Sequence, residues 1–269
     1  MTLPASGPIT AAQIRTELGL APGATFTIPS AEIRALTGVA SGPIVWPNDF
    51  WGKSAVIADY QGNFSATGTG SSATVTIPGV TFGAASGTRR MFMSISVAGA
   101  SAADRSLGSA TIGGIAATIH TQTHDRNTGT SAIFILAIIS AEVPTGTSGD
   151  VVVTVSGVPS SGNYTVKVLS YRAMSLTGAI VDADSGHPVS GGSHSISVTS
   201  PSSGFLIVTA LQREGGSIDI TDPATAEDYT DSNFAGLFQT GHASGSQTCT
   251  VSAPSAGTCA IAAITWQHT

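Results

Sequence analysis

"ATVTIPGVTF", residues 73–82, and "RRMFMSISVAGA", residues 89–100, decide the fold class of this chain. In the first stretch Val75 and Ile77 alternate with threonines, and in the second every other residue from Met91 to Val97 is apolar. Alternation of this kind is typical of β-strands that bury one face and expose the other. Two such segments joined by a turn containing Gly and Ser indicate an all-β fold.

The same signal recurs along the chain, which holds roughly eleven short segments of strand character separated by Gly, Ser, Pro or Asn. "SAIFILAIIS", residues 131–140, is apolar almost without interruption, so we expect a strand buried on both faces. We predict an all-β, jelly-roll-like two-sheet β-sandwich over residues 56–269, preceded by a small α+β docking module over residues 1–55. Residues 176–195 would form a long loop between the sheets; alternatively they divide the body into two sub-sandwiches.

Composition excludes several classes of function. Charged residues make up 10% of the chain and hydrophobic residues 41%, so the surface must consist largely of Ser, Thr and Gly. A net charge of −6 does not provide the basic surface that nucleic acid requires. The longest apolar run, residues 132–139, is far shorter than the roughly 20 residues of a membrane helix. "MTLPASGPIT" lacks the charged and apolar regions of a secretory signal, so we expect folding in a cytoplasm without membrane insertion.

The first 55 residues repeat a small unit. "AAQIRTELG" (residues 11–19) returns as "SAEIRALTG" (residues 30–38), and "GPIVWPNDFWGKS" (residues 42–54) forms a third unit. Thr10, Ser30 and Asn48 stand where helix N-caps belong. Helices of two turns are unstable alone, so they must pack on each other, on the following domain as a cap, or on another protein. We favour docking, through these apolar residues: Ile14, Leu18, Ile33, Leu36, Trp46, Phe50 and Trp51.

These units carry a family resemblance. "GPITAAQIRTELGL" (residues 7–20) and "AEIRALTGVASGPIVWPNDFWGKS" (residues 31–54) resemble a module found near the N-terminus of tailed-phage virion proteins. The match covers the whole module, although "VWPNDFW" stands where the family usually has Ser-Leu-Ser and Tyr. "SATIGGIAATI" (residues 109–119) and "AEVPTGTSGDVVVTVSG" (residues 141–157) are similar to β-sandwich domains of such proteins.

The resemblance implies a structural component of a tailed bacteriophage virion, a tail fibre or minor tail protein, assembled with other virion proteins in the host cytoplasm. It implies a homotrimer in many such proteins, and often contact with the host surface, where a surface polysaccharide is the ligand we consider. A head spike or capsid decoration protein is the alternative location. A virion-associated glycan hydrolase is a further alternative, but we expect no enzyme and no cofactor, because almost every Asp and Glu falls in a turn segment.

Three residue groups remain as candidate sites. His120 and His124 have the spacing of a metal pair on a helix, but their segment has strand character, so we expect no metal. The acidic stretch "DITDPATAEDYTD", residues 219–231, is interpreted as a solvated loop rather than a Ca²⁺ site. Within and beside it, Tyr229 and Phe234 are the candidates for glycan contact, because sugars pack on aromatic rings.

The two cysteines form a separate question. Cys249 and Cys259 would face each other across a hairpin if the residues between them turn, and could then form a disulfide. The favoured interpretation is two buried thiols in a reducing compartment.

Overall fold

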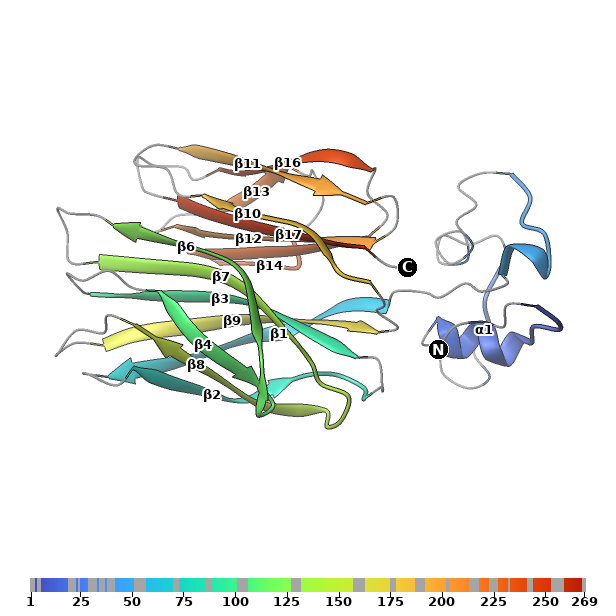
Figure 1. Cartoon of the computed structure of the whole chain (residues 1–269), viewed down its shortest axis with the longest axis horizontal. Helices are drawn as coiled ribbons and strands as arrows, with labels where there is room; N and C mark the ends of the chain where they lie inside the picture. Colours follow the sequence, from blue (N-terminus) through green and yellow to red (C-terminus); the bar gives the residue numbers. More distant parts are fainter. Residues whose placement is uncertain are drawn as a thin grey trace.

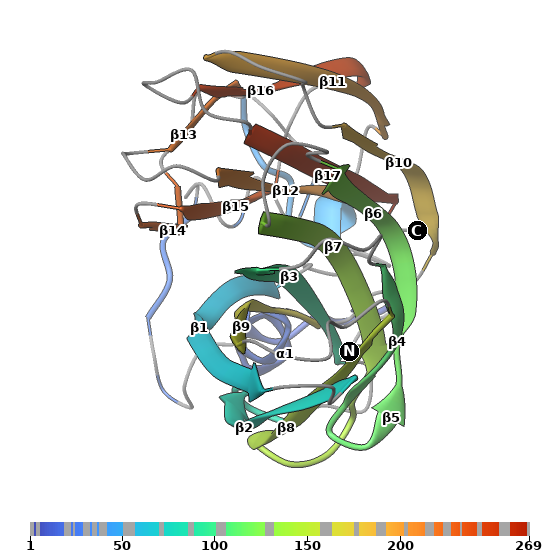
Figure 2. The same cartoon turned by 90° about the vertical axis from the view of Figure 1, so that its left-hand side faces the viewer.

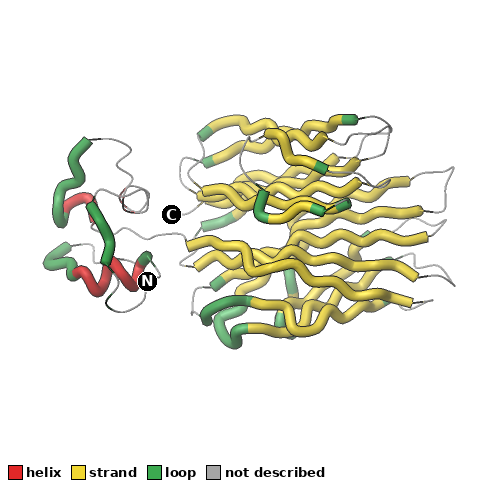
Figure 3. Tube along the Cα trace, turned by 180° about the vertical axis from the view of Figure 1, so that it is seen from behind, coloured by secondary structure: helices red, strands yellow, loops and turns green. Residues whose placement is uncertain are grey.

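The structure is a computed structural model of the whole chain. It describes residues 3, 6–18, 23, 25–28, 33, 37, 42–50, 57–69, 73–85, 89–100, 106–126, 132–156, 163–174, 178–186, 192–201, 204–212, 218–222, 227–231, 233–240, 244–252 and 259–267. Helix is confined to the N-terminal part of these residues, and strands joined by loops and turns make up the rest of the body (Figure 3). No helix among them is long and apolar enough to cross a membrane.

The N-terminal module holds helix α1 (Ala11–Glu17) and the 3-10 helix η1 (Asn48–Phe50). Thr10 caps α1 as predicted: its hydroxyl accepts from the backbone N–H of Gln13 at 3.2 Å, and the Gln13 side chain accepts from the Thr10 N–H at 2.7 Å. Asn48 lies inside η1 instead of before it, and the Asp49 carboxylate accepts the Val45 N–H at 2.6 Å. The predicted cap Ser30 lies outside the described residues.

Residues 57–174 form the first sandwich, from two antiparallel sheets. We name the first sheet A; its strands, in spatial order, are β1 (Ile57–Thr69), β9 (Asn163–Met174), β3 (Arg90–Ala100), β7 (Ala132–Glu142) and β6 (Thr118–Arg126). Sheet B opposes it, with β2 (Thr74–Thr81), β8 (Ser148–Val155), β4 (Leu107–Ile112) and β5 (Ile115–Ala116). The predicted alternation of β2 and β3 places their apolar side chains in the core between A and B.

Residues 180–267 form a second sandwich. Sheet C contains β10 (Ile180–Gly186), β17 (Cys259–Gln267), β12 (Gly204–Gln212), β15 (Phe234–Thr240) and β14 (Tyr229–Thr230). Sheet D contains β11 (Ser193–Ser200), β16 (Gly245–Ser252) and β13 (Asp219–Asp222). The four sheets stack in the order B, A, C, D (Figures 1 and 2).

The all-β sandwich prediction is therefore correct, but the favoured two-sheet body is not what the structure holds. A third core, between sheets A and C, joins the two sandwiches. Strands β7, β12 and β17 are buried on both faces because they belong to these two inner sheets. The stretch expected as a crossing loop, residues 176–195, instead contains β10 and the start of β11.

The two sandwiches share one topology. Strands β1–β4 correspond in order to β10–β13, and strands β6–β9 correspond to β14–β17. With this correspondence sheet A has the same strand order as sheet C, and β2-β8-β4 of sheet B has the same order as sheet D. The sequence carries a trace of this repeat, since "VTVSGVPSSGNYTVKVLSY" (residues 153–171) parallels "CTVSAPSAGTCAIAAITW" (residues 249–266). The body is thus built from two copies of one sandwich fold.

The two copies pack through equivalent sheets. Phe92 of β3 and Phe205 of β12 hold equivalent positions, and their rings meet edge to face at 5.0 Å. On one side of this pair β9 lies against β15, where the rings of Tyr171 and Phe238 are 5.9 Å apart, and on the other side β7 lies against β17. This arrangement is that of two subunits related by a two-fold axis between β3 and β12, here within a single chain.

The Arg89 side chain links two chain segments at one end of the first sandwich. Its side chain is fully buried, and its guanidinium donates to the carbonyls of Val143 (2.6 Å), Thr145 (2.7 Å), Gly83 (2.9 Å) and Ala84 (3.0 Å). Burial, and then the charge of Arg172, lowers the pKa of Arg89. Arg89 satisfies carbonyls of the segments that follow β2 and β7, so its role is structural.

Candidate functional site

The apolar residues expected to dock the N-terminal module mostly build its own core. Ile14, Ile33 and Phe50 are fully buried and pack with Leu3 and Ile9, and Leu18 packs against this cluster. Helix α1 and its neighbours bury their apolar faces on each other because such short helices need a partner. Leu36 and Trp51 lie outside the described residues.

Trp46 differs from the other predicted docking residues. It is 47% exposed, and its neighbour Val45 is 50% exposed. The Trp46 ring lies next to the Phe50 ring, with the ring centroids 5.0 Å apart. Within the described part of the chain, the core of the module contains no residue of the sandwiches. Val45 and Trp46 are thus apolar side chains of the module that stay exposed beside its core.

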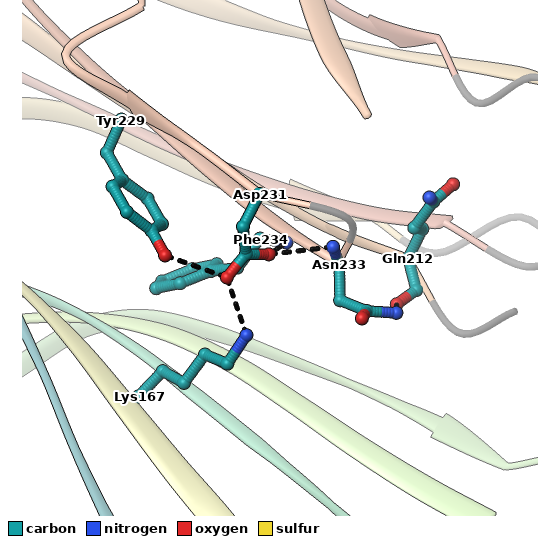
Figure 4. A network of polar contacts seen from close by, with 6 residues as sticks. All are labelled: Lys167, Gln212, Tyr229, Asp231, Asn233 and Phe234. Atoms are coloured by element: carbon teal, nitrogen blue, oxygen red, sulfur yellow. Dashed lines mark hydrogen bonds and ion pairs between the residues drawn. The ribbon is translucent and has the colours of Figure 1, made fainter. Parts of the chain in front are cut away.

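A polar network crosses the boundary between the two sandwiches. Lys167, on β9 of sheet A, extends toward the connection between β14 and β15 and lies 2.6 Å from Oδ2 of Asp231 (Figure 4). Asp231 Oδ2 also accepts from the Tyr229 hydroxyl at 2.8 Å. Its Oδ1 accepts the backbone N–H groups of Asn233 at 2.7 Å and Phe234 at 2.8 Å. Asp231 thus ties a turn of the second sandwich to a strand of the first.

The electrostatics of Asp231 favour the charged form. Burial acts to raise its pKa, but hydrogen bonds from Lys167, Asn233, Tyr229 and Phe234 outweigh that effect and the net pKa is lowered. The pKa of Tyr229 is raised by burial and by its hydrogen bond to Asp231. The network therefore contains an ion pair with no net charge. Asp231 holds the Lys167 ammonium and the Tyr229 hydroxyl in place.

Hollows lie next to Lys167 between the sheets. One, of about 470 Å³, is lined by Ser96, Ala98, Gly99, Phe134, Asn163, Thr165, Lys167, Leu211 and Asn233. The other, of about 140 Å³, is lined by Asn63, Phe64, Ser65, Lys167, Leu169, Tyr229 and Phe234. The larger volume falls in the range of about 300–1,000 Å³ that is usual for small-molecule sites.

The two predicted glycan residues have different surroundings. Tyr229 is half-buried and lines the smaller hollow, so it remains a candidate contact. Phe234 is fully buried in the core between the sandwiches. Its segment is strand β15, not a loop, and alternation points the Phe234 side chain at sheet A. Phe234 is therefore a core residue and not the accessible glycan contact that we predicted from the sequence.

The opposite side of the A–C interface holds a second polar cluster. His120 is the extra residue of a β-bulge in β6, and its Nε2 lies 2.7 Å from Ser140 Oγ. Arg90 pairs with Glu142 at 2.5 Å and lies over the Trp266 ring at 4.9 Å. Burial, and then the charge of Arg90, lowers the pKa of His120 to about 4. His120 is therefore neutral near pH 7 and packs on Trp266, with ring centroids 6.1 Å apart.

Among the described residues, no three His, Cys, Asp or Glu side chains lie close enough together to hold a metal ion. The acidic stretch is used for backbone hydrogen bonds. Asp228 accepts the Phe238 N–H at 2.6 Å, and Glu227 accepts the Ile220 N–H. Asp228 and Glu227 thus link the start of β14 to β15 and β13.

Cys249 and Cys259 are buried and not joined in a disulfide. The hairpin that the alternative with a disulfide required is not present, because β16 pairs with β11 and β13 in sheet D, whereas β17 pairs with β10 and β12 in sheet C. Both side chains lie in the core of the second sandwich.

Sequence reasoning missed Lys167, Phe134 and Asn163 of the larger hollow. Each lies on a strand that the sequence predicted, but the sequence did not predict that a second sheet faces that strand. The one available signal was Lys167 itself, a charged residue inside the otherwise regular strand "NYTVKVLSY".

Comparison with known protein families and with curated proteins finds no match to this chain.

Proposed function

We propose that this chain is a non-enzymatic structural protein of a tailed-phage particle. Residues 1–55 attach it to other virion proteins, and the tandem sandwich projects outward as a tail fibre or minor tail protein that contacts a host surface polysaccharide. The proposal includes a homotrimer, which would multiply each attachment surface by three.

One observation carries the attachment role. The module closes a small core of its own from Leu3, Ile9, Ile14, Ile33 and Phe50. Val45 and Trp46 stay exposed beside that core, although they are among the most apolar side chains of the module. Exposed apolar side chains that lie together can mark a surface where proteins bind each other, and Trp is enriched at the centre of such surfaces.

The alternative of a head spike or decoration protein uses the same module and differs only in where it docks. The alternative of a glycan hydrolase needs two carboxylates about 5–10 Å apart across a cleft. The described lining of the two hollows beside Lys167 contains no carboxylate, and a further hollow, lined by residues of β4 and β8 among others, has Asp150 as its carboxylate among the described residues. Asp231 lies next to two of them, but its oxygens already accept four hydrogen bonds.

The test is the position and copy number of the chain in intact particles, by cryo-electron microscopy and quantitative mass spectrometry. We expect the double change Val45→Ser and Trp46→Ala to reduce incorporation strongly. The matched control is Ile115→Ser, which changes a side chain of the body that is 39% exposed.

Loss of incorporation with the module variant alone supports attachment through residues 1–55. Equal incorporation of all variants contradicts it. Copies at the tail tip or baseplate support the fibre or minor tail protein, and copies spread over the capsid support the alternative location.

A further inference from the structure

The larger hollow between the sandwiches is built like a binding site rather than like a packing defect. Sheet A supplies most of its wall, through side chains of β3, β7 and β9 that point toward sheet C, and Leu211 and Asn233 close it from the second sandwich. Packing defects in cores are small and apolar. This hollow is large, about 470 Å³, and its described lining combines polar and apolar groups.

Its polar groups are available to a ligand. Ser96, Asn163 and Thr165 make no side-chain hydrogen bond within the part of the chain that the structure describes. The ammonium of Lys167 has three N–H groups and gives one of them to Asp231. The wall therefore combines two hydroxyls, an amide and two ammonium donors, which can pair with a ligand rich in hydroxyl groups.

The charge of the site is balanced. Among the described residues of its lining, Lys167 alone carries a charge, and Asp231 neutralises it at 2.6 Å. An anionic ligand would have to displace a carboxylate that also holds Tyr229 and two backbone N–H groups. A cationic ligand would meet the Lys167 ammonium. An uncharged ligand fits this balance best.

An aromatic ring provides the apolar side. Phe134 lines the hollow and is half-buried, whereas the equivalent residue of the second sandwich, Phe234, is completely covered. Ala98 and Leu211 extend the apolar surface beside Phe134. A flat apolar patch next to hydroxyl and amide groups suits a pyranose ring, which has C–H groups on one face and hydroxyls around its edge.

We propose that this hollow binds a single uncharged sugar ring of a surface polysaccharide, with Phe134 under the ring and Lys167, Thr165 and Ser96 on its hydroxyls. The proposal deepens the polysaccharide contact of the proposed function, but it does not depend on how the chain is attached to a particle.

The experiment is a titration of the full chain with methyl glycosides of glucose, galactose, mannose, rhamnose and N-acetylglucosamine, and with glucuronic acid as the charged member. Saturation-transfer NMR detects binding and calorimetry measures Kd. We expect at least one uncharged glycoside to bind with a millimolar Kd, as a ligand of about a dozen heavy atoms should.

Two variants locate the site. Phe134→Ala removes the platform and should weaken binding about tenfold. Thr165→Val removes a hydroxyl at nearly constant volume and should weaken it about fivefold. The matched control is Thr154→Val on β8, an equally half-buried threonine of sheet B that does not line the hollow.

Binding of an uncharged glycoside that is weakened by both pocket variants and kept by the control supports the proposal. Three results overturn it: no glycoside binds, glucuronic acid alone binds, or the pocket variants bind as well as the parent chain. Because no particle is involved, these results are independent of the incorporation experiment.

Discussion

Ser170 and Thr265 occupy equivalent positions in the two sandwiches and make the same hydrogen bond. Ser170 Oγ donates to the carbonyl of Thr81 across sheets A and B at 2.9 Å, and Thr265 Oγ1 donates to the carbonyl of Thr199 across sheets C and D at 2.6 Å. Both hydroxyl residues are fully buried. A repeated fold has therefore kept one polar link between its layers at the same place in both copies.

Removing either link should destabilise the chain. Ser170→Ala and Thr265→Val each leave a carbonyl at the layer boundary without its donor, and we expect a loss of about 1–3 kcal/mol in the free energy of unfolding. Urea unfolding followed by tryptophan fluorescence measures this. The outer-face variant Thr154→Val should change stability by less than about 0.5 kcal/mol. Equal effects of all three variants would show that the two links carry no special weight.

The Lys167–Asp231 pair should respond unequally to the loss of its two members. Asp231→Ala leaves a half-buried ammonium, the Tyr229 hydroxyl and two backbone N–H groups without their acceptor, so we expect a loss of about 2–4 kcal/mol. Lys167→Met leaves the carboxylate with three of its four donors and should cost about 1 kcal/mol. Chemical unfolding of both variants checks the order.

The matched control for that pair is Glu142→Gln, which weakens the ion pair with Arg90. The Glu142 side chain is 75% exposed, so its loss should cost no more than about 1 kcal/mol. If Lys167→Met proved more harmful than Asp231→Ala, the view of Asp231 as the organising group would be wrong.

The sequence allowed the strands to be predicted, but not which sheets they join. Alternation in β2 and β3 correctly identified the buried face of each strand, and the apolar run of β7 correctly identified a strand covered on both sides. A two-sheet sandwich leaves its outer faces in water, so strands without alternation already imply a third layer. "GFLIVTAL" and "CAIAAITW" also lack alternation and therefore also indicate strands that are buried on both faces. They belong to β12 and β17, which lie with β7 in the two inner sheets.

The candidate site was less predictable, because it forms where two distant parts of the chain meet. Lys167 and Asp231 are 64 positions apart, and no local pattern joins them. The alternative of a hairpin between the cysteines was wrong for a related reason: a connection between two strands does not determine whether the second strand stays in the same sheet. In this topology β16 and β17 belong to different sheets.

Protonation of His120 should weaken the fold in mild acid. The folded pKa of about 4 lies below the ordinary value of 6.5, so the unfolded chain binds more protons between those values. Stability is therefore lost as the pH falls from about 6.5 toward 4, by at most about 1.4 kcal/mol per pH unit, and by less because the ring keeps some contact with solvent.

The measurement is the free energy of unfolding of the parent chain and of His120→Gln at several pH values between 7 and 4. The variant should show a shallower decrease, and the difference between the two curves isolates His120 from the carboxylates. His124→Gln, on the same strand but outside the Arg90–Trp266 cluster, is the matched control for exchanging an imidazole for an amide. Parallel curves for the parent and His120→Gln would rule out this role of His120.

The thiols of Cys249 and Cys259 should react slowly in the native protein and completely in the unfolded one. Both side chains are buried in the core of the second sandwich, and burial raises the pKa of the Cys259 thiol, which lowers the thiolate fraction. After reductant is removed without exposure to air, Ellman's reagent should find two thiols per chain in guanidinium chloride. Under native conditions the rate should follow the opening of the second sandwich, so variants that weaken it, such as Thr265→Val, should speed the reaction. Fast labelling of the native chain, at a rate unaffected by such variants, would place these cysteines at a surface and contradict the packing of sheets C and D.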